Sequence, residues 1–210
     1  MIGIERMSPI SPAQNAARTW RPGALSSSLL SIAVGGSLSL ACVNFPSSAS
    51  QGTTLPRDVI VPLNGVVRHF PDITSEASTG RNLTATGDPK ATRMVVYAID
   101  TGPKKVTITV DQYRSPRDAS SAYRQAVQKS QSVHGFKLIP VANLGQQTFA
   151  GIVTIDAETH IGLGLLDDKL IVGATLAGYD ATPDNSAKLV ALARIQAASA
   201  KKAAGPSGRR

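Results

Sequence analysis

Three residues that alternate along one predicted strand offer the most suggestive chemistry in the sequence. Asp156, Glu158 and His160 lie two positions apart, and alternate residues of a strand share one face of a sheet. Two carboxylates and an imidazole on one face would suit a divalent metal or acid–base catalysis. A turn at Asp156-Ala157 would remove Asp156 from that face, and charged residues are common in turns. We therefore predict turn residues here, with no catalytic, metal-binding or cofactor-binding residues.

Other motifs for catalysis or phosphate binding are incomplete. Gly173–Gly178 has the glycine spacing of a phosphate-binding loop but lacks the Lys and Ser/Thr that should follow. Gly162-Leu163-Gly164 lacks the third glycine of a dinucleotide fingerprint. The sequence contains no Gly-x-Ser-x-Gly elbow, paired-His zinc helix or cysteine pair. An enzyme is the less favoured expectation, although a triad assembled only by folding leaves no sequence pattern.

The most apolar part of the chain is predicted to be a hairpin followed by a helix. The strands are Glu158–Leu166 and Lys169–Tyr179, joined at Asp167-Asp168. Both alternating sets of the second strand are apolar, which is typical of a central strand covered on both faces. A helix should begin at Thr182-Pro183-Asp184, because Thr can cap the first amides and Pro suits the first turn.

Pairing this hairpin around Asp167-Asp168 predicts a small pocket. It places Gly162 opposite Gly173, and His160 opposite Thr175 on the same face. Two facing glycines leave a gap in the side-chain layer beside the imidazole. Close packing of the helix on the sheet is the explanation we favour over a pocket, since glycine in a strand often marks a near approach of backbone.

The remaining pattern predicts an α+β fold. Further strands and a helix capped at Ser115-Pro116 are expected before the hairpin, in segments beginning at residues 93, 105, 115, 136 and 147. The order ββαββββα indicates an antiparallel sheet of about six strands with two main helices packed on it. This order resembles the PsbP-like α/β/α sandwich, which several exported bacterial lipoproteins use. The resemblance covers roughly Arg93–Ala198 and implies no functional residue.

The segment that leads into this fold is predicted to be irregular. Val59-Ile60-Val61 and Val66-Val67 are short apolar runs broken by Pro62 and Gly65, which favours short edge strands. The polar stretch Pro71–Pro89 is predicted to be a loop.

The net charge of +8 is located mainly outside the predicted domain. Residues 57–198 carry 15 Lys and Arg against 13 Asp and Glu, a net +2, and the rest of the chain carries seven basic residues against one acid. Aromatic residues make up only 4% of the chain. Neither a basic face nor interleaved stacking aromatics are present, so the sequence gives no indication of nucleic-acid binding.

The beginning of the sequence has the features of a bacterial export signal. Arg18 and Arg21 precede an apolar run, Ala24–Val43, which six serines dilute. A basic flank, a modest apolar run and small residues after it favour a secretory signal over a stable membrane span. Export to the periplasm or outer cell envelope is therefore expected.

Leu38-Ser39-Leu40-Ala41-Cys42 resembles the lipobox of bacterial lipoproteins. The resemblance implies that Cys42, the single cysteine, becomes a lipidated first residue and attaches the protein to a membrane. The usual pattern has Leu three places before the cysteine, where this sequence has Ser39. Ordinary cleavage after Ala41 or Ala49, giving a soluble exported protein, is the alternative.

The predicted organisation has four parts. Residues 1–42 form the export signal, 43–56 a flexible linker rich in Ser and Thr, 57–198 a single α+β domain, and 199–210 a disordered basic tail. The predicted role is a non-catalytic binding or interaction module, with an apolar small molecule or an envelope protein as partner. The alternatives are a hydrolase or metal-assisted enzyme centred on His160, and a structural lipoprotein.

Overall fold

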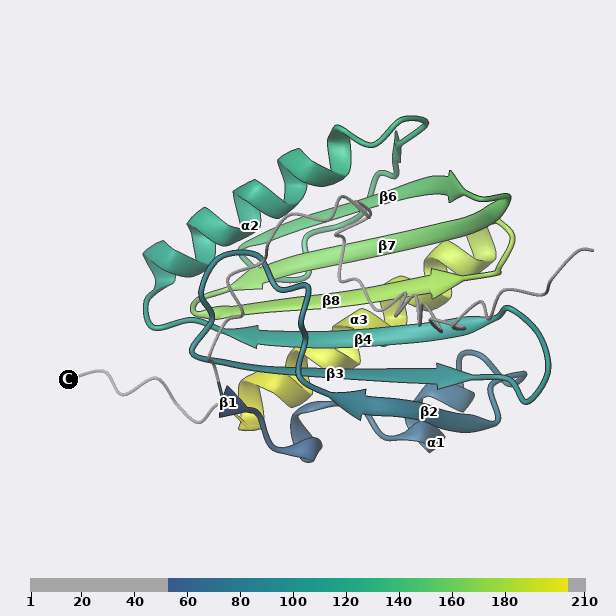
Figure 1. The fold of residues 1–210 in the computed structure, drawn as a ribbon, viewed down its shortest axis with the longest axis horizontal. Coiled ribbons are helices and arrows are strands. Elements are labelled where there is room, and N and C mark those ends of the chain that lie inside the picture. Colours follow the sequence, from purple (N-terminus) through teal and green to yellow (C-terminus); the bar gives the residue numbers. More distant parts are fainter. Residues whose placement is uncertain (1–52, 204–210) are drawn as a thin grey trace, which may run out of the picture. The chain divides into compact units, whose positions relative to one another are not determined.

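The computed structural model describes residues 53–203, which form one large sheet with helices on both faces (Figure 1). The strand order is β1-β3-β4-β8-β7-β6-β5, and β2 pairs with β3 as well. All pairs are antiparallel except β1 with β3. The elements are β1 Thr53–Thr54, η1 Arg57–Val59, α1 Leu63–Val67, β2 Ser75–Gly80, β3 Ala91–Ala98, β4 Lys105–Gln112, α2 Pro116–Gln131, β5 Lys137–Leu138, β6 Gln147–Ile155, β7 Glu158–Asp167, β8 Leu170–Ala177 and α3 Pro183–Ala203.

Helix α3 covers one face of the sheet. Alternate residues of the three central strands, such as Ile108 in β4, Leu163 in β7 and Leu176 in β8, form a buried cluster with Leu189 and Leu192 of α3. Each of these side chains is at most 1% exposed. Burying such side chains contributes roughly 1.5–3 kcal/mol each before the entropy of ordering the chain is subtracted.

Helix α2 packs on part of the opposite face. Ala119, Ala122 and Tyr123 of α2 form a second, smaller cluster with Leu166 of β7 and Ile171 of β8. Leu166 and Ile171 alternate with the residues that face α3, so the two clusters lie on opposite sides of the sheet. The predicted α+β class is therefore correct, with helices layered on both faces.

Both predicted helix starts are confirmed. The Ser115 hydroxyl accepts a hydrogen bond from the Asp118 amide at 3.1 Å, and Pro116 is the first residue of α2. The Thr182 hydroxyl accepts one from the Asn185 amide at 3.2 Å, and Pro183 begins α3. Helix α3 continues to Ala203, five residues beyond the predicted domain end, so part of the predicted disordered tail is helical.

The sheet is larger than predicted, because eight strands are present instead of about six. Part of the expected loop Pro71–Pro89 is strand β2, whose polar residues lack the hydrophobic alternation that predicts a strand. The expected strand at Phe136–Ala142 is reduced to β5, and the last residues of the predicted linker form β1.

The apolar segment between β1 and β2 is also different from the prediction. It forms η1 and α1 instead of edge strands, and its residues Val59–Val61 and Val66 are buried in the cluster around α3. Pro62 immediately precedes α1, a position where its missing amide hydrogen costs nothing.

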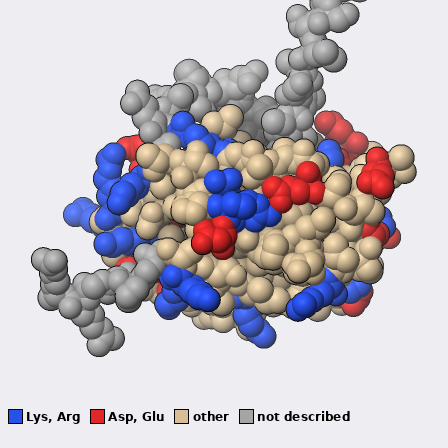
Figure 2. Space-filling view, turned by 90° about the horizontal axis from the view of Figure 1, so that it is seen from below, with Lys and Arg blue, Asp and Glu red and all other residues tan. Residues whose placement is uncertain are grey.

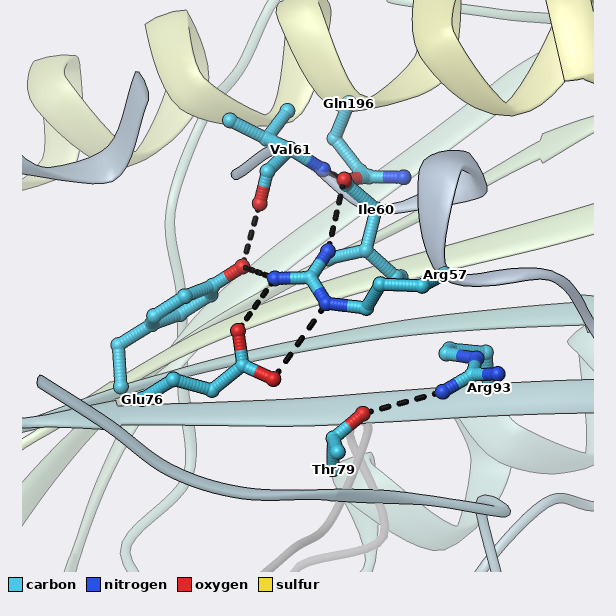
Figure 3. Close-up of polar contacts among 8 residues, drawn as sticks. Arg57, Ile60, Val61, Glu76, Thr79, Arg93 and Gln196 are labelled. Carbon is cyan, nitrogen blue, oxygen red and sulfur yellow. Dashed lines mark hydrogen bonds and ion pairs between the residues drawn. The ribbon is translucent and has the colours of Figure 1, made fainter. Parts of the chain in front are cut away.

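Gln196 of α3 attaches this entry segment to the domain. Its side chain is fully buried and lies beside the backbone of the segment (Figure 3). The Gln196 Nε2 donates to the Val59 carbonyl at 2.6 Å, and Oε1 accepts from the Val61 amide at 2.8 Å. The Gln196 side chain therefore supplies the hydrogen bonds that a neighbouring strand would otherwise give to the Val59 carbonyl and the Val61 amide.

Arg57 and Tyr97 complete the attachment, and Figure 3 shows the Arg57 guanidinium between Ile60 and Glu76. The Arg57 guanidinium donates to the Ile60 carbonyl at 3.0 Å, to Glu76 and to the Tyr97 hydroxyl at 2.9 Å. The Tyr97 hydroxyl in turn donates to the Val61 carbonyl. Burial raises the pKa of Tyr97, against the opposing effect of Arg57, so it remains a neutral donor.

Charged side chains of both signs are spread over the surface. Seen from below, basic and acidic groups both occur, with uncharged surface between them (Figure 2). Among residues 53–203, no helix is long and apolar enough to span a membrane. The predicted export signal and Cys42 lie outside the described residues.

Replacing Gln196 by Leu should destabilise the domain by about 2–4 kcal/mol, because the Val59 carbonyl and Val61 amide lose their partners inside the core. Urea unfolding of the purified domain measures this change. Gln125→Leu, on the exposed face of α2, is the matched control and should change the free energy of unfolding by less than about 0.5 kcal/mol. Equal effects of the two substitutions would contradict the role given to Gln196.

Candidate functional site

The four residues of the predicted pocket share one face of the sheet, but their pairing differs from the prediction. Gly162 lies opposite Thr175, Gly164 opposite Gly173, and His160 opposite Ala177. The predicted pairs of Gly162 with Gly173 and of His160 with Thr175 are therefore wrong.

The register differs because the hairpin turns one residue later than expected. Asp167 pairs with Leu170, and Asp168 adopts the left-handed backbone conformation with φ of 54°. Asp tolerates this conformation better than most residues. The resulting shift of two positions keeps every side chain on its predicted face, because the side-chain period of a strand is two.

His160 is a buried histidine beside one carboxylate. Its Nε2 lies 4.0 Å from the Glu158 carboxylate, and its side chain is 7% exposed. Burial lowers the pKa of His160, Glu158 opposes that shift and Lys105 adds to it. His160 lines neither of the two cavities described below.

The set of Asp156, Glu158 and His160 is broken by a turn. Asp156 and Ala157 both have positive φ, 50° and 66°, and β7 begins only at Glu158. Two-residue hairpin turns favour such conformations. Among the described residues, 53–203, no group of three or more His, Cys, Asp or Glu is arranged to hold a metal ion.

A buried carboxylate lies on the same face, under the edge of α2. Asp111 of β4 is 3% exposed, and both of its carboxylate oxygens accept hydrogen bonds from the Asn82 Nδ2, at 2.9 and 3.0 Å. Burial raises the pKa of Asp111 to about 7, against the opposing effect of the Asn82 hydrogen bonds. The Tyr113 hydroxyl, 2.6 Å from the Thr86 carbonyl, fixes the same loop to β4.

A narrow cavity adjoins Asp111 where two glycines face each other. Gly164 and Gly173 line it together with Tyr123 and Val127 of α2, and its volume is about 20 Å³. That space is enough for a single water molecule. The structure therefore contains a gap of the predicted kind, with Gly164 in place of Gly162 and without His160.

A much larger groove runs between α2 and the start of β6. Its volume is about 510 Å³, within the range of small-molecule sites. Its lining combines two aromatic rings with four carboxamides and one guanidinium, contributed by Tyr123, Arg124, Val127, Gln128, Asn143, Gln146, Gln147, Thr148 and Phe149. None of the lining residues is acidic.

Backbone and side-chain hydrogen bonds hold the loop wall of the groove in place. The Gln146 amide donates to the Leu166 carbonyl at 2.9 Å, and the Gln146 Oε1 accepts from the Asp168 amide at 3.3 Å. The Leu144 amide donates to the Thr148 hydroxyl at 2.8 Å. The loop is thereby tied to both β6 and the β7–β8 turn.

Other polar groups of the groove are available for a ligand. The side chains of Arg124, Gln128, Asn143 and Gln147 are exposed and make no hydrogen bond or ion pair with residues of the described part of the chain. They stand around the buried rings of Tyr123 and Phe149. The groove therefore has an apolar floor and a rim of unused hydrogen-bonding groups.

The aromatic floor is held rigid by its own packing. Phe149 stacks on Phe136 with ring centroids 5.5 Å apart and planes inclined by 5°. Phe136 occupies the space that a side chain at Gly151 would need, since a Cβ there would lie 2.1 Å from the ring. The Tyr123 hydroxyl donates to the Gly164 carbonyl at 3.3 Å, and burial raises its pKa to about 12.

Sequence reasoning did not find this groove. In the sequence, Arg124 and Gln128 lie within the predicted helix that begins at Ser115, and Gln147 lies at the start of a predicted strand. Carboxamides around aromatic rings follow no fixed spacing, so no motif marks them. The faint signal was the concentration of Asn and Gln around residues 125–131 and 143–147.

Comparisons with known proteins give little further information. No protein-family model matches the chain, and no curated protein matches it significantly. Among solved structures, it is similar to the extracellular domain of PknH from Mycobacterium tuberculosis, at 8% identity and a TM-score of 0.47. That similarity covers 67% of this chain and 93% of the other.

Asp111 should make the stability of the domain fall as the pH rises from about 4 to 7. In that range the folded carboxyl keeps a proton that the unfolded chain has released, so the free energy of unfolding decreases, by up to about 4 kcal/mol in total. Urea unfolding across this range should show the decrease in the native protein and in Asp180→Asn, an exposed control, but not in Asp111→Asn. Parallel profiles for all three proteins would contradict it.

Gly151→Ala should destabilise the domain by about 1–3 kcal/mol and disturb the floor of the groove, because Phe136 must move away from the new methyl group. Thermal unfolding and the near-UV circular dichroism of the aromatic rings measure the two effects. Gly80→Ala in β2 is the control, since a Cβ there meets nothing within 4 Å. An unchanged Gly151→Ala protein would show that Phe136 does not depend on this glycine.

Proposed function

We propose that the chain is an exported protein of the bacterial cell envelope whose α+β domain acts as a non-catalytic binding module. The export signal and the lipobox-like segment ending at Cys42 support the location. Cys42 is proposed to carry the lipid anchor, and a soluble exported form that begins later in the chain is the alternative.

The observation that carries the binding role is the groove between α2 and β6. A rigid apolar floor with convergent, unpaired polar groups is the usual form of a ligand site. The groove is built from a helix, a strand and a loop that is hydrogen-bonded to β6 and to the β7–β8 turn. Such a site holds its aromatic rings and its loop in place before a ligand arrives, which reduces the entropy lost on binding.

His160 is a weaker centre for the proposed function than the groove. Its imidazole is buried, has a lowered pKa and has one carboxylate 4.0 Å away. A hydrolase would need a group of this kind next to a space that receives the substrate. Neither the groove nor the narrow cavity beside α2 includes His160.

Native mass spectrometry of the protein isolated from the envelope of its own host tests the proposal. We expect a covalent mass that begins at Cys42 and includes acyl chains, together with a non-covalently bound ligand. Gln147→Trp should remove the ligand by filling the groove, whereas Gln125→Trp, on α2 outside the groove, should retain it.

The covalent mass tests the lipid anchor, and the bound ligand tests the groove. A covalent mass without acyl chains, whether it begins at Cys42 or later, would replace the lipid anchor with soluble export. A domain without bound ligand in the native protein and both variants, or a ligand that survives Gln147→Trp, would contradict the groove as the binding site.

A further inference from the structure

From the chemistry of the groove, we infer that its ligand is a saccharide that carries one anionic substituent. This inference rests on the proposed binding function and specifies the class of ligand. It is argued from the groups that line the groove: four carboxamides, one guanidinium, one Thr hydroxyl and two aromatic rings.

The carboxamides argue against an apolar ligand. Gln128, Asn143 and Gln147 are free to bind water in the empty groove. An apolar molecule of a size that fills about 510 Å³ would strip that water and leave their polar groups unpaired. A ligand rich in hydroxyl groups would instead replace the water, because each carboxamide offers two donors and an acceptor.

The charges argue against strongly charged ligands. Arg124 is the one charged residue among those that line the groove. A polyphosphate or nucleic-acid strand would need several cations along its backbone. A divalent cation would need carboxylate oxygens, which the lining lacks. One guanidinium without an ion-pair partner suits a single carboxylate or phosphate group on an otherwise neutral molecule.

The floor of the groove fits the apolar side of a sugar ring. Tyr123 and Phe149 are both buried at their far ends, Tyr123 through its hydroxyl and Phe149 through the stack with Phe136. Tyr123 is 4% exposed and Phe149 7%, so together they offer the groove a narrow, rigid apolar strip. A sugar ring has C–H groups on its faces and hydroxyl groups around its edge, so it complements such a floor and rim. The groove volume corresponds to about two or three sugar rings.

A peptide strand is a poorer fit at this place. Beyond the groove, the edge of β6 is paired with Lys137 and Leu138 of β5 at Ile152 and Gly151, and the Ala150 carbonyl accepts from the Ile139 amide, which leaves only the short stretch 147–149 for a peptide strand. Peptides that bind beside a strand depend on these main-chain groups. The free groups around the groove are side chains, which suits recognition of hydroxyl groups.

The test uses sialyllactose, a trisaccharide that carries one carboxylate, and its methyl ester, which has the same rings without the charge. Both are titrated into isotope-labelled protein while backbone NMR signals are followed. We expect shifts confined to α2, the loop at 143–147 and the start of β6, with the acid bound about fivefold more tightly than the ester.

Variants separate the charge from the carboxamides. Arg124→Gln should remove the preference for the acid and leave the ester unaffected, whereas Arg117→Gln, an exposed Arg of α2 outside the groove, should change neither. Replacing both Gln128 and Gln147 by Ala should weaken both ligands about tenfold. Equal binding of acid and ester by the native protein, or loss of the preference in Arg117→Gln, would overturn the anionic part of the inference.

Failure of the saccharide inference is distinguishable from failure of the proposed function. A ligand found in the native protein and lost in Gln147→Trp, with no NMR shifts from either trisaccharide, would retain the binding module and overturn the saccharide class. Shifts from a tetraalanine peptide in the groove, with none from the trisaccharides, would do the same. An empty groove in both experiments would overturn both.

Discussion

The burial of strand β8 on both faces is the interaction on which the rest of the structure depends. β8 lies between β4 and β7, and each of its residues except Thr175 is buried. Its alternate side chains face α3 on one side and the α2 side on the other. A strand in this position must be covered twice, because either uncovered face would expose a row of apolar groups to water. The positions of both helices therefore follow from the need to cover the two faces of β8.

The two faces are covered unequally, and this difference creates the candidate site. Helix α3 is 21 residues long and packs with η1, α1 and most of the large aliphatic side chains. Helix α2 is shorter and packs on small residues such as Gly164 and Gly173, on a face that also holds Asp111 and Thr109. Because α2 does not fill the space toward β6, polar residues of α2 and the loop at 143–147 border an open groove.

Elements with strong local signals were predictable from the sequence. Both helix caps, the alternation in Lys105–Gln112 and the long apolar hairpin depend on neighbouring residues, so their patterns are visible in the chain itself. Strand β2 was not predictable, because its polar sequence has no hydrophobic alternation. The strand forms because its backbone pairs with β3. The segment of η1 and α1 was mistaken for strands, because the partner that satisfies its backbone is Gln196, 135 residues away from Val61.

By itself, the sequence determined the α+β class, the starts of the two main helices, and the face of the sheet on which His160, Gly162, Gly173 and Thr175 lie. These depend on local periodicity and on the side-chain period of two, which a register shift of two preserves. Only the tertiary structure decided which glycines face each other, that Asp156 leaves the set with Glu158 and His160, and that Arg124 and Gln147 border one groove. Each of these depends on where a turn closes or how a helix lies across a sheet, and such distances between remote segments leave no pattern in the chain.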